Sequence, residues 1–219
     1  MTTPRFSLLV PVKNGRGAKT RLGGIDASGR AELMGAFARD AIAAARRSAL
    51  VEVHVVGDEA ALHELARDLD VPVLPDEGGG DLNEALRRAA ARVARPGRGV
   101  AAMLGDLPCL RTEDLELALT ARGRAYVADA AGTGTTLLVS PEGDLDPRFG
   151  PGSARAHARS GATPVRGDLR SLRLDVDTTD DLDRALLLGI GPHTSEVLDR
   201  LGWTTRPGLA PGRPNGDAP

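Results

Sequence analysis

FSLLVPVKNGRGAKTRLGG, residues 6–24, places a short apolar run directly before a loop rich in glycine and positive charge. Residues 6–12 are mostly aliphatic and lead straight into turn-forming residues, which predicts a buried β-strand. The loop 13–24 holds two lysines, two arginines and at least three glycines. Glycine lets a backbone approach a ligand closely, and basic, glycine-rich loops after a first strand commonly bind phosphate. An ordinary solvated turn is the alternative.

The composition of the 219-residue chain limits the classes of function. Its length suits one medium domain, or one domain with extensions. Hydrophobic residues make up 41% but aromatic residues only 2%, so the core must consist of Leu, Val and Ala. A net charge of -2 supplies no broad positive field, which argues against general binding of nucleic acid.

The single cysteine and the lengths of the apolar segments limit the possible metal sites and the possible cellular location. Cys109 excludes an internal disulfide and a multi-cysteine zinc site, and we interpret it as a buried core thiol. No apolar run is long enough to span a membrane, and the N-terminus lacks the pattern of a signal peptide. We therefore expect a cytoplasmic protein without a membrane partner.

Strand and helix patterns alternate along most of the chain. Strands are predicted near 6–12, 50–57, 71–76, 99–110, 125–130 and 133–140, and helices near 27–48, 58–70, 81–94, 112–121, 153–160 and 180–189. This alternation indicates an α/β fold, in which a mainly parallel, mixed sheet forms the middle of a three-layer α/β/α sandwich. We assign one domain to residues 1–203. Residues 204–219 are too rich in Pro and Gly to fold, and we expect a disordered tail.

The opening loop matches neither common nucleotide-binding motif. Aligning Lys19 on a Walker A lysine puts other residues where both glycines are required, and the spacing of Gly15 and Gly17 does not fit G-x-G-x-x-G. The loop still offers backbone N–H groups together with Lys13, Lys19 and Arg21. That set suits a triphosphate, because charge accumulates on a departing pyrophosphate.

Three aspartates follow apolar segments in a pattern that suits a metal ion. Asp106 stands in the acidic turn that ends the segment predicted at 99–110, at the carboxyl end of its strand, where open parallel sheets bind ligands. Asp175 and Asp177 are two residues apart in an extended segment, so their side chains share a face. Carboxylates in such positions are natural ligands of Mg²⁺. The alternative is structural: Asp177 or Thr178 caps the next helix, and Asp106 is an ordinary turn residue.

Two later segments are rich in glycine and hydroxyl groups. They are ADAAGTGTTLL, residues 128–138, and DPRFGPGSARAHARSGA, residues 146–162. Ser153 stands at the start of the helix predicted over 153–160, where amides and a hydroxyl make a second anion site. His157 in the same helix receives no role, since a single helical histidine is mostly structural or solvated. Thr112 is predicted as the N-cap of its own helix.

The order of these motifs resembles the guanylyltransferases of coenzyme F(420) biosynthesis. The matching motifs are VPVK (10–13), AKTRL (18–22), LN (82–83), GDLP (105–108), GTGT (132–135), RFGPGS (148–153) and DVDT (175–178). The resemblance is nearest to the actinobacterial branch, which uses phosphoenolpyruvate, whereas archaeal relatives use 2-phospho-L-lactate. It implies a nucleotidyltransferase fold of the nucleotide-diphospho-sugar transferase type.

The resemblance also implies roles for individual residues. Asp106, Asp175 and Asp177 correspond to the family's metal-binding carboxylates. Thr135, Gly150 and Ser153 fall on its phosphoenolpyruvate-binding positions, and Asn83 and the opening loop are expected to hold GTP. The product, enolpyruvyl-2-diphospho-5'-guanosine, is then expected to pass to a separate deazaflavin transferase, and the enzyme to be a monomer or homodimer.

Three rival interpretations remain open from the sequence. The same reaction could use 2-phospho-L-lactate or 3-phosphoglycerate, which are equally small phosphorylated carboxylates. A glycosyltransferase of related fold is a weaker alternative. Its DVD motif would be expected near mid-chain, where GDLP (105–108) stands in this sequence. A catalytically inactive nucleotide-binding regulator is a different class, and the dense negative cluster argues against it.

Overall fold

The computed structural model describes residues 6–12 and 22–203, and its centre is one seven-stranded sheet. The strands are β1 (Phe6–Pro11), β2 (Val51–Gly57), β3 (Val73–Pro75), β4 (Gly99–Met103), β5 (Ala125–Ala128), β6 (Thr135–Ser140) and β7 (Thr163–Pro164). Their order across the sheet is β3-β2-β1-β4-β6-β5-β7. Only β6 pairs antiparallel with its neighbours among these strands. The predicted α/β fold with a mainly parallel, mixed sheet is therefore confirmed.

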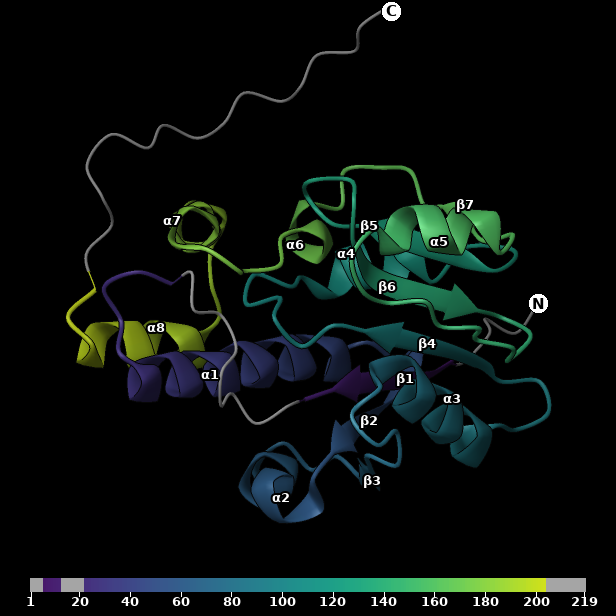
Figure 1. Cartoon of the computed structure of the whole chain (residues 1–219), viewed down its shortest axis with the longest axis horizontal. Helices are drawn as coiled ribbons and strands as arrows, with labels where there is room; N and C mark the ends of the chain where they lie inside the picture. The colour runs from purple at the N-terminus through teal and green to yellow at the C-terminus, as the bar shows by residue number, and fades with distance from the viewer. Residues whose placement is uncertain (1–5, 13–21, 204–219) are drawn as a thin grey trace, which may run out of the picture.

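Helices cover both faces of this sheet (Figure 1). They are α1 (Ala27–Arg46), α2 (Glu59–Asp68), α3 (Leu82–Val93), α4 (Thr112–Ala118), α5 (Ser153–Arg159), α6 (Arg170–Arg173), α7 (Thr179–Leu188) and α8 (Pro192–Arg200). Apolar side chains of α1, α2, α4 and α6 pack on one face, and those of α3 and α5 pack on the other. A third cluster joins α7 and α8 to the first half of α1. None of the helices in the described part is long and apolar enough to cross a membrane.

Side chains of the central strands alternate between these two faces. In β1, Phe6, Leu8 and Val10 enter the cluster beneath α1, whereas Leu9 enters the cluster beneath α3. This is the period of two that a pleated strand imposes. Both faces are apolar because helices cover both, which explains why β1 appears in the sequence as a continuous apolar run.

Two helices begin with the N-terminal caps that the sequence predicts, and a third does not. The helix at 81–94 begins after Asp81, whose side chain accepts from the amides of Asn83 and Glu84, and Thr178 forms a capping box with Asp181. The prediction for Thr112 is wrong, since Arg111 occupies the N-cap position. The Thr112 hydroxyl donates instead to the Ala44 carbonyl at 2.8 Å, a tertiary bond that ties α4 to the last turn of α1.

Other differences concern short or late elements. β7 has only two residues, α6 only four, and α8 was not predicted at all. Their sequences are too short or too polar to show a period, and packing against longer elements defines them. The tail assigned to residues 204–219 lies outside the described residues, so its disorder remains a prediction.

The pairing of β4 with β6 sets the geometry of one sheet edge. Because the two strands are antiparallel, the first residue of β6, Thr135, lies beside the carboxyl end of β4. The Leu104 amide donates to the Thr136 carbonyl at 2.9 Å and extends this pairing beyond β4. The carboxyl ends of β1, β4 and β5 and the start of β6 therefore meet at the same edge.

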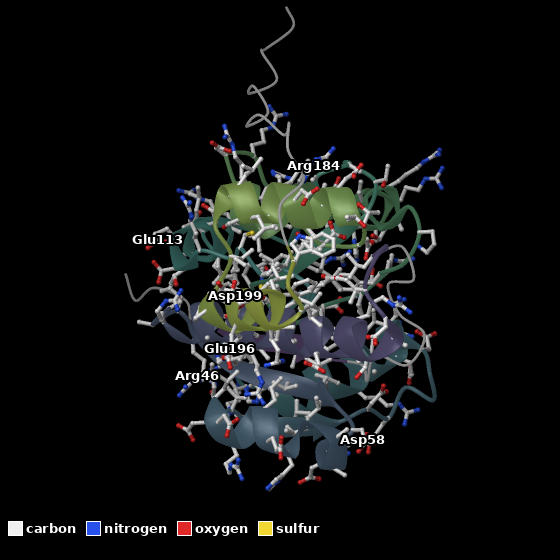
Figure 2. The ribbon with its side chains drawn as sticks, turned by 90° about the vertical axis from the view of Figure 1, so that its left-hand side faces the viewer. Arg46, Asp58, Glu113, Arg184, Glu196 and Asp199 are labelled. Atoms are coloured by element: carbon white, nitrogen blue, oxygen red, sulfur yellow. The ribbon has the colours of Figure 1, made fainter. Side chains whose placement is uncertain are left out.

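Helix α8 is anchored by a buried carboxylate in the middle of α1. Both oxygens of Asp40 accept hydrogen bonds from first-turn amides of α8, His193 N at 3.1 Å and Thr194 N at 2.8 Å. A Cβ on Gly191 would stand 2.3 Å from the Asp40 carboxyl carbon, so only glycine allows this approach. In the side view of Figure 2, α8 lies directly against α1, with Glu196 and Asp199 on α8.

We expect Asp40→Ala to lower the free energy of unfolding by about 2–4 kcal/mol. Two hydrogen bonds to a charged acceptor are lost, each worth about 1.5–3 kcal/mol, and two amides lose their partner. Urea denaturation measures the change. Asp199→Ala, at an exposed position on α8, is the matched control and should change stability by less than about 0.5 kcal/mol. Equal effects of the two substitutions would contradict the anchoring role.

Candidate active site

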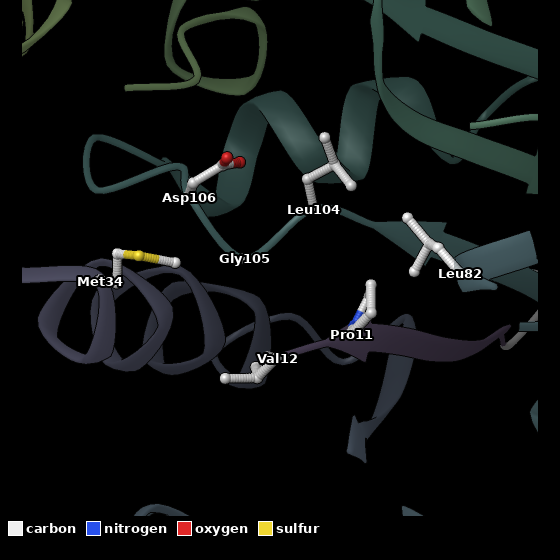
Figure 3. Close-up of a pocket in the computed structure, with 7 residues that line it drawn as sticks. All are labelled: Pro11, Val12, Met34, Leu82, Leu104, Gly105 and Asp106. Atoms are coloured by element: carbon white, nitrogen blue, oxygen red, sulfur yellow. The ribbon is translucent and has the colours of Figure 1, made fainter. Parts of the chain in front are cut away.

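A pocket opens at the carboxyl ends of β1 and β4 (Figure 3). Its walls come from β1, α1, α3 and the segment after β4; the lining residues are Pro11, Val12, Met34, Leu82, Leu104, Gly105 and Asp106. All of these side chains except that of Asp106 are apolar. The pocket thus combines an apolar surface, suited to a flat ring, with one carboxylate at its edge.

The glycine-rich loop begins at this pocket. Val12 lines the pocket and is the last described residue before the loop, and Leu22, the first after it, is fully buried. The loop residues predicted to bind nucleotide phosphates, Lys13, Gly15, Gly17, Lys19 and Arg21, lie outside the described residues. Their role stays a prediction.

The three predicted metal-binding aspartates come from two segments that are hydrogen-bonded to each other. Asp106 follows β4, and Asp175 and Asp177 lie between α6 and α7. The Val176 amide donates to the Asp106 carbonyl at 3.1 Å, and the Val176 side chain is fully buried. Asp175 and Asp177, on either side of Val176, are more exposed than it, in agreement with the predicted shared face.

The raised pKa of Asp175 indicates that these carboxylates interact. Burial raises the pKa of Asp175 to about 7, and repulsion by Asp106, Asp177 and Asp129 adds to the effect. A carboxylate near another negative charge, in a partly desolvated position, is destabilised when ionised. The site therefore contains a concentration of negative charge that a bound cation would offset.

The described residues hold no ready-made metal cage. Within 6–12 and 22–203, no group of three His, Cys, Asp or Glu side chains is arranged to hold a metal ion. The donor set nevertheless fits one: carboxylate oxygens are the ligands that Mg²⁺ prefers, usually one or two of them together with phosphate oxygens. The assignment of Asp106, Asp175 and Asp177 as ligands remains a prediction.

Asp129 belongs to this site, although the sequence analysis gave it no role. Its carboxylate accepts from the amides of Thr133 at 2.9 Å and Gly134 at 2.8 Å, which closes the turn between β5 and β6. The motif DAAGTG carried the available signal, since an Asp before a glycine-rich turn commonly bonds to amides a few residues on. Its proximity to Asp175 follows from the contact of the turn after β5 with α6, where the Ala130 amide donates to the Arg173 carbonyl at 2.8 Å, and the sequence does not reveal this contact.

The residues predicted to bind the small acid also gather at this edge. Thr135 begins β6, Ser153 begins α5, and the Ala154 amide donates to the Thr133 carbonyl at 3.1 Å, which ties the two segments together. The Thr135 and Ser153 side chains are each only 2% exposed. The Ser153 amide already donates to the Gly150 carbonyl, so the first amides of α5 are largely engaged within the protein.

Gly150 is the most open of the predicted acid-binding positions. Its φ of 132° is a conformation that side chains rarely adopt, and a Cβ built there would meet no atom within 4 Å. The backbone at Gly150 can therefore face a ligand without obstruction. The structure brings Thr135, Gly150 and Ser153 together, and their contact with substrate remains a prediction.

Asn83, predicted to contact GTP, has a structural role. Its side-chain nitrogen donates to the Phe149 carbonyl at 2.9 Å, and its oxygen accepts from the Phe149 amide at 2.6 Å. These paired bonds join the first turn of α3 to the loop 146–152. A contact with GTP would have to use the N–H and the oxygen lone pair of the Asn83 side chain that these two bonds leave. That contact stays a prediction.

Cys109 is a core residue, as predicted. Its thiol is 3% exposed and donates to the Ala185 carbonyl at 3.2 Å. Burial raises its pKa to about 12, so the thiolate needed for nucleophilic chemistry does not form near neutral pH.

Comparison with solved structures identifies the class of fold. A protein from Desulfovibrio desulfuricans G20, described as a nucleotide-diphospho-sugar transferase, has a TM-score of 0.65 and 18% sequence identity, with coverage of 90% of this chain and 96% of that chain. At this identity the likeness establishes the fold alone. The chain thus has a nucleotidyltransferase fold of the nucleotide-diphospho-sugar transferase type.

Comparison of sequences identifies the family. The model described as "Guanylyl transferase CofC like" matches residues 6–213. Phosphoenolpyruvate guanylyltransferase 1 of Rhodococcus jostii is 45% identical (92% of this chain, 96% of that protein), and phosphoenolpyruvate guanylyltransferase of Streptomyces coelicolor is 46% identical (90% and 97%). The chain belongs to this family of guanylyltransferases, which confirms the resemblance found in the sequence.

We expect Asp175→Asn to raise the melting temperature of the metal-free protein at pH 8. The native pKa of Asp175, about 7, lies above the unfolded value near 3.8, so between about pH 4 and pH 7 the native state retains a proton that the unfolded chain has lost. Stability therefore falls as pH rises from about 4 to 7, and asparagine removes that loss. The gain should disappear near pH 4, where the carboxyl is protonated in the native state.

Thermal unfolding in the presence of a chelator measures this effect. Asp168→Asn is the control, because Asp168 is an exposed carboxylate paired with Arg170 at 2.9 Å and should give no such gain. A lower melting temperature for Asp175→Asn at pH 8 would contradict the crowding of negative charge.

Proposed function

We propose that this chain condenses GTP with phosphoenolpyruvate to give enolpyruvyl-2-diphospho-5'-guanosine and diphosphate, in coenzyme F(420) biosynthesis. The names of its relatives support this proposal, since the chain covers 96% and 97% of the two proteins compared above. The observation that carries it is the carboxylate cluster around Asp175, which adjoins the predicted acid-binding residues. Both substrates are anions, so their reaction requires charge neutralisation at one place.

The reaction is a substitution at phosphorus. A phosphate oxygen of phosphoenolpyruvate forms a bond to the α-phosphorus of GTP, and the bond from that phosphorus to the α–β bridging oxygen breaks. Pyrophosphate leaves with the electron pair of the broken bond. The attacking phosphate is already ionised at neutral pH, so no strong general base is required. Positioning and charge neutralisation supply most of the rate, as in other phosphoryl transfers.

Asp106, Asp175 and Asp177 would hold Mg²⁺. Bound there, the ion would neutralise charge on the phosphate oxygens of the nucleotide. The aspartates contribute by holding negative charge at a fixed point of the sheet edge, between the β4 end and the segment before α7. The raised pKa of Asp175 supports this arrangement, because burial and the neighbouring carboxylates both disfavour its ionised form, and a bound cation would offset both effects.

The nucleotide and the acid would occupy different sides of the cluster. The apolar pocket suits the guanine ring or ribose, and Lys13, Lys19 and Arg21 would bind the triphosphate with the backbone of Gly15 and Gly17. Thr135, Gly150 and Ser153 would bind phosphoenolpyruvate, with the open backbone at Gly150 facing the ligand. The product would pass to a separate transferase that moves the phosphoenolpyruvyl group to a deazaflavin alcohol.

A substrate comparison tests the proposed function. Purified protein with GTP and Mg²⁺ should release pyrophosphate with phosphoenolpyruvate at a kcat/KM at least about tenfold above that with 2-phospho-L-lactate or 3-phosphoglycerate, a difference of about 1.4 kcal/mol. Asp177→Asn should lose more than tenfold in kcat and remain folded. A preference for another acid would overturn the substrate assignment, and GTP binding without turnover would favour a regulator.

A pair of substitutions tests the division into two binding sides. Ser153→Ala removes a neutral donor to a charged phosphate, worth about 1.5–3 kcal/mol, and should raise KM for phosphoenolpyruvate about tenfold while KM for GTP stays within about twofold. Lys19→Ala should show the opposite bias and a lower kcat, because charge grows on pyrophosphate in the transition state. Steady-state kinetics with each substrate varied distinguishes the two patterns. If Ser153→Ala raised KM for GTP and left KM for phosphoenolpyruvate unchanged, the assignment of Ser153 to the acid-binding side would be contradicted.

A further inference from the structure

His157 is a fully buried side chain in the middle of α5. Its ring lies 5.3 Å from that of Phe149 in an edge-to-face contact and 6.0 Å from that of Tyr126, measured between centroids. The imidazole is thus enclosed by apolar rings, an environment where each ring nitrogen needs a partner. Both nitrogens have one.

The partners determine which nitrogen carries the proton. The Arg148 backbone amide donates to Nε2 at 2.9 Å, so Nε2 must present a lone pair. In a neutral imidazole the proton then resides on Nδ1. Nδ1 lies 2.9 Å from the Thr135 hydroxyl oxygen, so Nδ1–H donates to Thr135. The Thr135 hydroxyl accepts from His157, and its own hydrogen is left to donate in another direction.

The ring stays in this neutral form over the working range of pH. Burial lowers the pKa of His157 to about 4; the nearby Arg124 and Arg148 charges lower it further, and Asp146 and the Ser153 backbone oppose the shift in part. A protonated ring would have no lone pair for the Arg148 amide. The Thr135 and Arg148 contacts therefore hold together at neutral pH.

His157 joins the three segments that carry the proposed acid-binding residues. Thr135 begins β6, Arg148 lies two residues before Gly150, and the Ser153 carbonyl faces the ring from the first turn of α5. Along the chain, Thr135 is 22 residues from His157 and Arg148 is nine residues from it. The imidazole thus links the start of β6 and the segment before Gly150 to α5, in addition to the backbone bonds from Ala154 to Thr133 and from Ser153 to Gly150.

The loop between Asp146 and Gly150 is held from a second side as well. The Arg148 amide donates to His157, and the next amide, that of Phe149, donates to Asn83 on α3 at 2.6 Å. Two consecutive amides are therefore held by side chains from two different helices. The backbone just before Gly150 has little freedom to rotate.

We propose that His157 is a positioning residue for the phosphoenolpyruvate side of the site, through its paired hydrogen bonds to Thr135 and to the Arg148 amide. This inference rests on the proposed function for the identity of the ligand. His157 touches no reacting atom. It acts by holding the Thr135 hydroxyl and the Gly150 backbone at a fixed spacing, which reduces the cost of ordering them when the acid binds.

Three substitutions at this position separate the two bonds. In His157→Asn the amide reaches the place of Nδ1 and can keep the bond to Thr135, whereas in His157→Gln it reaches the place of Nε2 and can keep the bond to Arg148. His157→Leu removes both. We expect KM for phosphoenolpyruvate to rise at least tenfold in His157→Leu and by an intermediate factor in the other two, while KM for GTP stays within about twofold.

The readouts distinguish a positioning role from general destabilisation. Ala89→Gly, a buried position on α3 beneath the same face of the sheet, is the control: it should lower the melting temperature without a selective rise in KM for phosphoenolpyruvate. If the His157 variants change both KM values equally, or leave KM for phosphoenolpyruvate within twofold, the proposal is overturned. Absence of turnover by the wild-type protein would instead count against the proposed function.

A measurement on the wild-type protein tests the geometry without any assay. Nitrogen NMR of the imidazole should show the proton on Nδ1 and none on Nε2 from pH 8 down to pH 5.5. A proton on Nε2, or a charged ring at pH 5.5, would overturn the proposal even if all three variants failed to fold.

Discussion

The antiparallel pairing of β6 with β4 is the constraint on which the candidate site depends. In an all-parallel sheet, the start of β6 would lie at the edge opposite the end of β4. Because β6 runs the other way, Thr135 stands beside the segment that carries Asp106. Asp129, just after the end of β5, reaches the same edge because β5 runs antiparallel to β6 and so in the same direction as β4. The reversal of β6 thus brings Thr135 to the edge where the carboxylates lie.

Charge repulsion at that edge has a cost that the rest of the fold must offset. Asp175 is partly buried beside like charges, and its raised pKa shows that the native structure disfavours ionisation. Fully buried neighbours, such as Val176 and Leu172, hold the segment in place by apolar packing. Crowded carboxylates of this kind are typical of functional sites, where stability is given up for an interaction with a ligand.

Buried and half-buried polar side chains also order the segments around the site. Asp40 holds α8 on α1, Asn83 holds the Phe149 backbone, and His157 holds the Arg148 amide and Thr135. Each bonds to at least one backbone amide of a different segment. Such bonds fix loops that would otherwise be only loosely packed, because an amide in a buried position must find an acceptor.

The sequence by itself determined the class of fold, the family and the set of candidate residues. Strand-helix alternation and the motifs that follow β1 and β4 depend on local chemistry, which a sequence displays directly. The tertiary structure alone decided that Asp129 joins the carboxylates, that Asn83 bonds to Phe149, and that His157 is buried with both nitrogens engaged. These contacts link residues far apart in the chain, and no local pattern encodes which strand lies beside which. The same holds for Thr112, where a partner in α1 replaced the local cap.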